Sequence, residues 1–422
     1  MKEKGTDPRA RLPLAFHYPF FVRLWTGSIV SSVGTQMNNV AKAWVLYQLT
    51  DSAAALGLEG LCFALPIAVL PLLAGPAVDR FDRLTAVKIA MVVETAEAAA
   101  LAAAAATGTL SPWMIYSAAG VAAARLSFAI PAGSALVPGL VGGKALLSAQ
   151  SLSAVVWSSS ALIGPALGGL LLAHAGATAV FAVNGFCTLG ALAMLRPVHG
   201  TALHRTPGQP AGPQQQSHSR LVHGFHFLRR NPQILTLQAL VFLTSTLLVG
   251  TETLLPVLDN QLWHAGTTGY GLLRTAPGVA AVIAGLWLSL RRTMTKPFRG
   301  VGLGIVAACT GLTAFVHAPA LTVGLPLLTM ATLGLISAQI LCATEIQRRT
   351  PDELRGAVGG ITAISQSGLA GIAAAGTAVA ASSIGSAAVE AIMAVGTAPL
   401  GIACATYAHR HENTPPTKTP PN

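Results

Sequence analysis

The sequence is poor in charge and lacks the motifs of common ATP-driven and hydrolytic enzymes. Only 10% of its 422 residues are Asp, Glu, Lys or Arg, and 52% are hydrophobic. A soluble domain carries about 25% charged residues. The chain has no phosphate-binding G-x-x-x-x-G-K-[ST] loop, since 142–145 fails the pattern, and no H-E-x-x-H or G-x-S-x-G sequence. We therefore expect a membrane protein that is not an enzyme and has no ATPase of its own.

Cysteine is also scarce, and no cysteine cluster has the spacing of metal ligands. The five cysteines are scattered through apolar stretches, which predicts small buried side chains rather than a disulfide framework. We expect no metal site and no cofactor. The net charge of +11 is not accompanied by a basic patch interleaved with aromatic residues, so we expect no nucleic-acid partner.

What the sequence has in abundance is long apolar runs. Each is long enough for a membrane-spanning helix, which needs about 20 residues, and runs such as Ala98–Ala106 have helical composition. Because backbone polar groups in lipid must be satisfied within the segment, the expected fold is all-α. Twelve such stretches are predicted, at 22–49, 54–75, 85–106, 112–136, 149–173, 177–196, 233–257, 269–290, 300–317, 319–344, 358–380 and 386–408.

The basic residues divide the connections between these stretches into two sets. Of the 26 Lys and Arg residues, 23 lie at the termini, in every second connection, or beside them, and the remaining connections have none. Cytoplasmic loops of membrane proteins collect Lys and Arg, where these residues also contact anionic lipids. The pattern predicts that both termini are cytoplasmic, and the richness in Ala and Gly suggests a bacterial inner membrane.

A polar stretch at 197–232 separates six predicted spans from six. Its Pro-, Gly- and Gln-rich first part predicts a flexible linker, and Arg220–Arg230 has the spacing of an amphipathic helix on the membrane surface. The expected organisation is a tail at 1–21, a six-helix bundle at 22–196, this linker, a second six-helix bundle at 233–408 and a tail at 409–422. In each half, a similar inner loop precedes a helix rich in small residues. This similarity indicates a weak internal repeat.

Several short motifs occur in a fixed order along the chain. Two of them are the stretches Gly75-Pro-Ala-Val-Asp79-Arg80-Phe-Asp-Arg83 and Gly164-Pro165-Ala-Leu-Gly168-Gly169. Together the motifs resemble the major facilitator superfamily, and specifically its drug and siderophore (enterobactin-exporter-like) efflux branch. The first stretch is similar to the family's loop signature between helices 2 and 3, and the second is similar to its antiporter signature in helix 5. Further similarities lie at 34–37, 128–138 and 351–356, although Leu84, Ala129, Gly133 and Ser160 depart from the usual pattern. The resemblance implies two six-helix pseudo-repeat bundles and no stable partner chain, so a monomer.

The resemblance also implies roles for both motifs. The loop motif would form an inner gate between the halves, built from Gly75, Asp79, Arg80 and Arg83. The same residues also suit a basic membrane anchor with a helix cap. Gly164, Pro165, Gly168 and Gly169 would form the antiporter hinge, although the same small residues suit ordinary close helix packing.

Charged residues inside predicted spans give the sharpest indication of chemistry. A charge near the bilayer centre costs about 2.5–3.5 kcal/mol on insertion scales, so it usually faces a cavity or a partner. Glu94 and Arg125 lie near mid-depth, and Glu97 lies three residues from Glu94 on one helix face. We predict proton coupling at Glu94 with Arg125, with Glu97 and Glu59 as further candidates. The alternative is a static buried ion pair.

Other polar residues within spans are candidates for the substrate cavity or for contacts between helices. Glu252 and Arg274 lie at similar depth, which predicts a structural ion pair. The candidates for the cavity are Asn38, Lys42, Trp157, Gln339 and Gln366, with Asn39 beside Asn38.

The expected function is proton-coupled efflux of an amphipathic small molecule, such as an antibiotic, drug or siderophore, by alternating access. Alternatives are an importer or facilitator on the same fold and a membrane receptor or scaffold that transports nothing.

Overall fold

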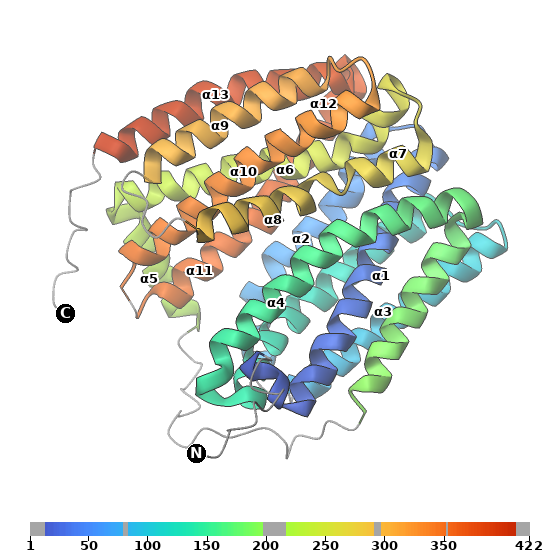
Figure 1. Cartoon of the computed structure of the whole chain (residues 1–422), viewed down its shortest axis with the longest axis horizontal. Helices are drawn as coiled ribbons and strands as arrows, with labels where there is room; N and C mark the ends of the chain where they lie inside the picture. Colours follow the sequence, from blue (N-terminus) through green and yellow to red (C-terminus); the bar gives the residue numbers. More distant parts are fainter. Residues whose placement is uncertain (1–12, 79–82, 197–216, 291–296, 352, 411–422) are drawn as a thin grey trace, which may run out of the picture.

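The computed structural model describes residues 13–78, 83–196, 217–290, 297–351 and 353–410, and within these ranges it contains helices and no strand. A short 3₁₀ helix, η2 (Leu14–His17), precedes α1 (Pro19–Thr50), α2 (Ala53–Val78) and α3 (Arg83–Ala106). The helical run α4 (Pro112–Met194) completes the first half. Figure 1 shows these elements, blue to green, grouped on one side of the molecule.

The second half begins with the short helix α5 (Ser217–Arg230), followed by α6 (Pro232–Leu262). The remaining helices occupy the other side of the molecule, yellow to red in Figure 1. They are α7 (Gly266–Leu273), α8 (Ala276–Ser289), α9 (Pro297–Phe315), α10 (Leu321–Arg349), α11 (Arg355–Ala363), the π-helical segment η5 (Ile364–Leu369), α12 (Ala370–Ile384) and α13 (Ser386–Arg410).

The run α4 is not a single straight helix. Trp25 of α1 donates a hydrogen bond to the carbonyl of Leu152, and a Cβ placed on Gly27 of α1 would lie 3.4 Å from Ala191. Because both ends of 152–191 lie beside the same turn of α1, the chain must leave and return. Gly176, with φ +74°, marks the reversal, since that conformation does not occur within a right-handed helix. Figure 1 shows the green ribbon folding back.

The described residues therefore support twelve passes. Ten stretches are long and apolar enough to cross a membrane, and one of them, Ala145–Met194, spans 50 residues and contains the reversal at Gly176. Dividing it in two and adding α1, which has 32 residues, gives the number predicted from the sequence. The passes are interrupted in places the sequence did not indicate, at Arg274–Thr275 between α7 and α8 and at the π-helical η5.

The two halves each have a non-glycine residue with positive φ at a matching position. Outside glycine, positive φ occurs among the described residues at Asp51 (45°) and His264 (52°), just after α1 and α6. Helix α1 starts at Pro19 and α6 starts at Pro232. The separation from Pro19 to Asp51 therefore equals that from Pro232 to His264. This register supports an internal repeat in which α1 corresponds to α6.

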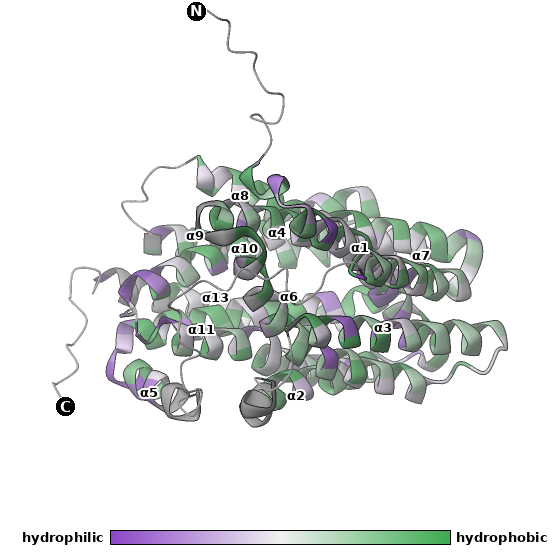
Figure 2. Cartoon of the chain, turned by 90° about the horizontal axis from the view of Figure 1, so that it is seen from below, coloured by the Kyte–Doolittle hydropathy of each residue, from purple (hydrophilic) through white to green (hydrophobic). Residues whose placement is uncertain are grey.

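The connections between helices lie at two opposite ends of the bundle. We use "terminal end" for the end holding the start of α1 and the end of α13, and "loop end" for the end holding Asp51, Gly176 and Gly385. Figure 1 shows the start of α1 and the end of α13 on the same side, away from the turn between α12 and α13. Figure 2 shows that apolar colouring covers most of the helices, as expected for a surface that meets lipid.

Candidate functional site

The predicted charged residues of the first half meet at mid-depth. Arg125 of α4 lies with Nη1 2.9 Å from Oε2 of Glu94 on α3, and both side chains are nearly buried. The hydroxyl of Thr35 on α1 donates a hydrogen bond to the other carboxylate oxygen of Glu94 at 2.6 Å. Three spans are thereby joined at one carboxylate, whose two oxygens each have a donor.

A second ion pair lies one turn further toward the loop end. Lys42 of α1 has its Nζ 3.7 Å from Oε1 of Glu97 on α3, with side chains 4% and 7% exposed. That separation exceeds hydrogen-bond length, and Glu97 Oε1 has no hydrogen-bond partner. Lys42, predicted for the substrate cavity, is therefore held by a carboxylate within the first half.

Glu59 of α2 stands between charges from both halves. The two basic groups that act on it electrostatically are Lys42 of the first half and Arg274 of the second. Arg274 in turn forms an ion pair with Glu252 of α6, as the sequence predicted from their depth. Acidic and basic groups thus alternate from Glu97 across the boundary to Glu252.

A cavity of about 400 Å³ lies beside the Glu94–Arg125 pair, in the terminal-end half of α1, α3 and α4. Its polar lining includes serines of α1 and α4 and Gln150, and its apolar lining includes aromatic side chains of α1. Glu94 and Arg125 are the charged residues among its lining. Cavities of roughly 300–1,000 Å³ suit small molecules.

The predicted antiporter hinge packs closely against neighbouring helices. A Cβ placed on Gly164 would lie 2.5 Å from Gln36 Cβ, and one on Gly168 would lie 2.9 Å from Met37 Cα, both on α1. A Cβ on Gly169 would lie 2.6 Å from the carbonyl oxygen of Thr267, at the start of α7. A Cβ placed on Gly271 of α7 would lie 2.8 Å from the carbonyl oxygen of Pro165. Pro165 and Gly169 therefore join the two halves near the loop end, whereas Gly164 and Gly168 pack against α1 within the first half.

Aromatic and amide contacts close the same boundary. Trp44 of α1 stacks on Tyr270 of α7 with ring centroids 5.6 Å apart, and Asn260 of α6 donates to the Tyr47 hydroxyl at 3.3 Å. A Cβ on Gly57 of α2 would lie 2.7 Å from the Cβ of Ala378 on α12. The halves therefore meet tightly on the loop-end side, and again where a Cβ on Gly368 of η5 would lie 2.6 Å from the Cβ of Ala68 on α2. The cavity lies within the first half, on its terminal-end side.

The other predicted cavity residues do not line that cavity. Asn38 is buried with an unpartnered Oδ1, and Asn39 donates to Gln36 within α1. Gln339 donates to Ser245 at 3.2 Å and so connects α10 with α6. Gln366 lies half-buried in η5, and Trp157 is 73% exposed.

The loop motif can be placed only in part. Gly75 lies in the last turns of α2, and Arg83 begins α3. Asp79 and Arg80 lie outside the described residues, so their gating role stays a prediction.

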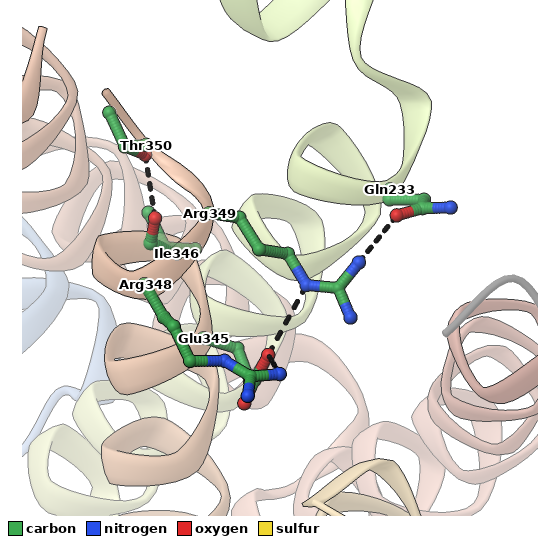
Figure 3. A network of polar contacts seen from close by, with 6 residues as sticks. All are labelled: Gln233, Glu345, Ile346, Arg348, Arg349 and Thr350. Atoms are coloured by element: carbon green, nitrogen blue, oxygen red, sulfur yellow. Dashed lines mark hydrogen bonds and ion pairs between the residues drawn. The ribbon is translucent and has the colours of Figure 1, made fainter. Parts of the chain in front are cut away.

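Sequence reasoning missed a polar network at the terminal end of α10. Arg349 donates to Glu345 at 3.2 Å and to Gln233 of α6 at 2.5 Å, and its guanidinium lies 5.3 Å from the Phe298 ring centre on α9. Arg348 also bonds Glu345, at 2.9 Å (Figure 3). The Glu-x-x-Arg-Arg spacing was a usable signal, since residues three and four apart share a helix face.

A further buried carboxylate was also missed. Glu390 of α13 is 0% exposed and accepts a hydrogen bond from Thr251 of α6 at 2.5 Å, while its second oxygen has no partner. Asp259 at the loop end of α6 is likewise fully buried. The described residues contain no group of His, Cys, Asp and Glu arranged to hold a metal ion.

The fold and these buried charges define a multi-pass membrane transporter of the major facilitator type. The chain belongs to the transmembrane secretion effector family (MFS_3), which matches residues 13–418. No curated protein matched the sequence.

Solved structures of transporters share the fold. The nucleoside transporter NupG is 13% identical, with a TM-score of 0.68 over 92% of this chain and 98% of that one. A bacterial homologue of the iron transporter ferroportin in an inward-facing state is 15% identical, with a TM-score of 0.68 over 92% and 98%. A bacterial homologue of the lysosomal transporter Spinster, also inward-facing, is 12% identical, with a TM-score of 0.66 over 96% of each chain. At these identities the likeness shows the fold alone.

Proposed function

We propose that the protein is a secondary active exporter that moves an amphipathic small molecule out of the cell in exchange for protons. The observation that carries the proposal is the buried Glu94–Arg125 pair beside the cavity. A carboxylate joined to an arginine can exchange its partner for a proton, and loss of the ion pair changes the balance of forces between α3 and α4.

The arrangement of contacts supports alternating access. The halves touch closely toward the loop end through Trp44, Tyr270 and Gly169, and the cavity lies toward the terminal end. In this proposal the terminal end is cytoplasmic and the structure represents a state open to the cell interior. Protonation of Glu94 from the outside, with Glu97 and Glu59 as relays, would complete the cycle.

The proposal also specifies the cellular location and the oligomeric state of the protein. It lies in a bacterial inner membrane as a monomer, surrounded by lipids, with both termini cytoplasmic, and catalyses no covalent reaction. Its orientation is tested in a cysteine-free background with Gly212→Cys and Pro415→Cys. An impermeant thiol reagent should leave both unlabelled in intact cells and label both after permeabilisation. Labelling of either in intact cells contradicts the orientation.

Transport is tested in inside-out vesicles with three probes that share a naphthalene frame and have polar groups of different charge: 1-naphthylacetamide, 1-naphthylacetate and 1-naphthylmethylammonium. An exporter should accumulate at least one probe when the vesicles are energised and lose it when a protonophore is added. Uptake into right-side-out vesicles instead would indicate an importer. A receptor or scaffold would show no protonophore-sensitive accumulation in either orientation.

A further inference from the structure

The cavity in the first half holds a balanced pair of charges and an unused hydrogen-bond donor. Both carboxylate oxygens of Glu94 are occupied, by Arg125 and by Thr35. The Nε of Arg125 is buried and has no hydrogen-bond partner among the described residues, and Arg125, whose side chain is 9% exposed, lines the cavity. A buried donor without an acceptor is costly, so a bound molecule that shifts the Arg125 side chain toward the cavity gains by accepting from this N–H.

The remaining lining is uncharged. Its hydroxyl and amide groups include those of Ser28, Ser31, Ser32 and Gln150, with further serines from α4, and the apolar wall includes Trp25. Charges outside the Glu94–Arg125 pair are absent from the described lining. A ligand with a net charge would enter a site of low dielectric with no group left to balance it, and burying an unpaired charge costs far more than burying a hydrogen-bonded neutral group.

A cationic ligand would have to displace Arg125 from Glu94 to gain a partner. That exchange would leave the guanidinium itself buried and unpaired. An anionic ligand would compete with Glu94 for the same guanidinium and leave the carboxylate unpaired. Either exchange breaks a buried pair and leaves one partner alone, which is strongly destabilising.

We infer that this cavity binds an uncharged amphipathic molecule, which presents a carbonyl or hydroxyl oxygen to the Nε–H of Arg125 and its apolar frame to the wall around Trp25. The site lies within the first half alone, among α1, α3 and α4. The inference rests on the proposed transport function and specifies its substrate class.

Binding to the purified protein in nanodiscs, measured by calorimetry, tests the inference directly. The same three probes are compared with 1-methylnaphthalene, which keeps the aromatic frame and lacks the acceptor oxygen. 1-Naphthylacetamide should bind about tenfold or more tightly than the other three, because it alone is neutral and offers an acceptor. Tighter binding of the ammonium or acetate probe, or equal or absent binding of all four, overturns the inference.

Arg125→Lys separates the donor from the charge. Lysine keeps a cation beside Glu94 but has no Nε–H in the guanidinium position. The variant should reduce the preference for 1-naphthylacetamide over 1-methylnaphthalene to about threefold or less. An unchanged preference in a folded variant shows that another group recognises the oxygen and overturns the assignment.

A steric pair locates the site without touching the ion pair. Ile130 lines the cavity and is 61% exposed, whereas Leu147 is 80% exposed and lies outside the lining. Ile130→Trp should reduce affinity for 1-naphthylacetamide at least tenfold, and Leu147→Trp should leave it unchanged. Equal effects of the two variants place the probe elsewhere.

The outcomes for binding and for transport are separable. If the neutral probe binds as expected but no probe accumulates in energised vesicles, the proposed transport function fails and the binding site stands. If probes accumulate in a protonophore-sensitive manner but a charged probe binds best, the transport function stands and the substrate class is wrong.

Discussion

The two halves of the molecule share a backbone plan but place their charges differently. In the first half, two ion pairs are buried within the spans, Glu94–Arg125 and Lys42–Glu97. In the second half, Glu252 pairs with Arg274, and Glu345 pairs with Arg348 and Arg349 at the terminal end of α10. Arg274 and Glu252 are 16% and 30% exposed and Arg348 is 64% exposed, whereas Arg349 and Glu345 are 9% and 8% exposed. The repeat therefore explains the scaffold, and in the described part of the first half an ion pair lies beside a cavity.

The second half has a deeply buried carboxylate of another kind. Glu390 is held by the hydroxyl of Thr251 and has no ion-pair partner among the described residues. Glu94 can exchange an arginine for a proton, whereas Glu390 has no basic partner to release. We infer that coupling belongs to the first half because there a change of protonation would break a buried ion pair between two spans beside the cavity.

Removing Arg125 should have the largest effect of any single change. Arg125→Ala leaves Glu94 buried without its charge partner, which should cost about 3–5 kcal/mol of stability and abolish transport. Thermal unfolding in detergent and vesicle accumulation measure both effects. Arg348→Ala is the matched control, because its exposed side chain should contribute less than about 1 kcal/mol. Equal losses in both variants would remove the distinction between the halves.

The contact between the halves should be the next most sensitive feature. Gly169→Ala places a methyl group against Thr267 and Gly271 of α7, and overpacking of this kind costs about 1–3 kcal/mol. Gly190→Ala is the control in the same helical run, since nothing lies within 4 Å of its added Cβ. Cross-linking between 44 and 270 should fall only in Gly169→Ala. Unaltered cross-linking would show that the halves tolerate separation there.

Loss of the charge at the boundary should have a moderate effect. Glu252→Gln removes the ion pair with Arg274, which is partly exposed, so stability should fall by about 1 kcal/mol or less. Urea or thermal unfolding measures the change, and it should shrink in high salt. A loss as large as that of Arg125→Ala would mean that the second half also depends on a buried pair.

Replacing the solitary carboxyl of the second half should have the smallest effect. Glu390→Gln keeps the shape and an oxygen that can accept from Thr251, and no ion pair is lost. Stability and protonophore-sensitive accumulation should both remain close to those of the unmodified protein. A transport-dead but folded Glu390→Gln protein would move the coupling centre to the second half.

Much of the fold was predictable because long apolar runs and the positions of Lys and Arg are direct consequences of a membrane environment. The mid-depth positions of Glu94 and Arg125 also predicted a partnership, since a single charge at that depth is costly. The breaks at Arg274–Thr275 and in η5 were not predictable, because apolar periodicity continues through them. Spacing did not place Glu390, whose burial depends on the rotation of α13 against α6.

The orientation of lone polar side chains was equally hidden. Gln339 contacts Ser245 and Asn38 is buried, yet neither lines the cavity, because helix rotation and not sequence position determines which face meets it. The serines beside Trp25 were missed for the converse reason, since a serine within a span gives no charge signal.

The central claim is that Glu94 carries the coupling proton, and uphill transport by Glu94→Gln tests it most directly. Purified protein is reconstituted in liposomes, and the naphthalene probe that accumulates in vesicles is followed in two assays: exchange between equal concentrations, and accumulation driven by a pH gradient. Glu94→Gln should exchange the probe but fail to concentrate it, while Glu390→Gln performs both. If folded Glu94→Gln protein concentrates the probe against its gradient in response to protons, coupling does not depend on Glu94 and the account is wrong.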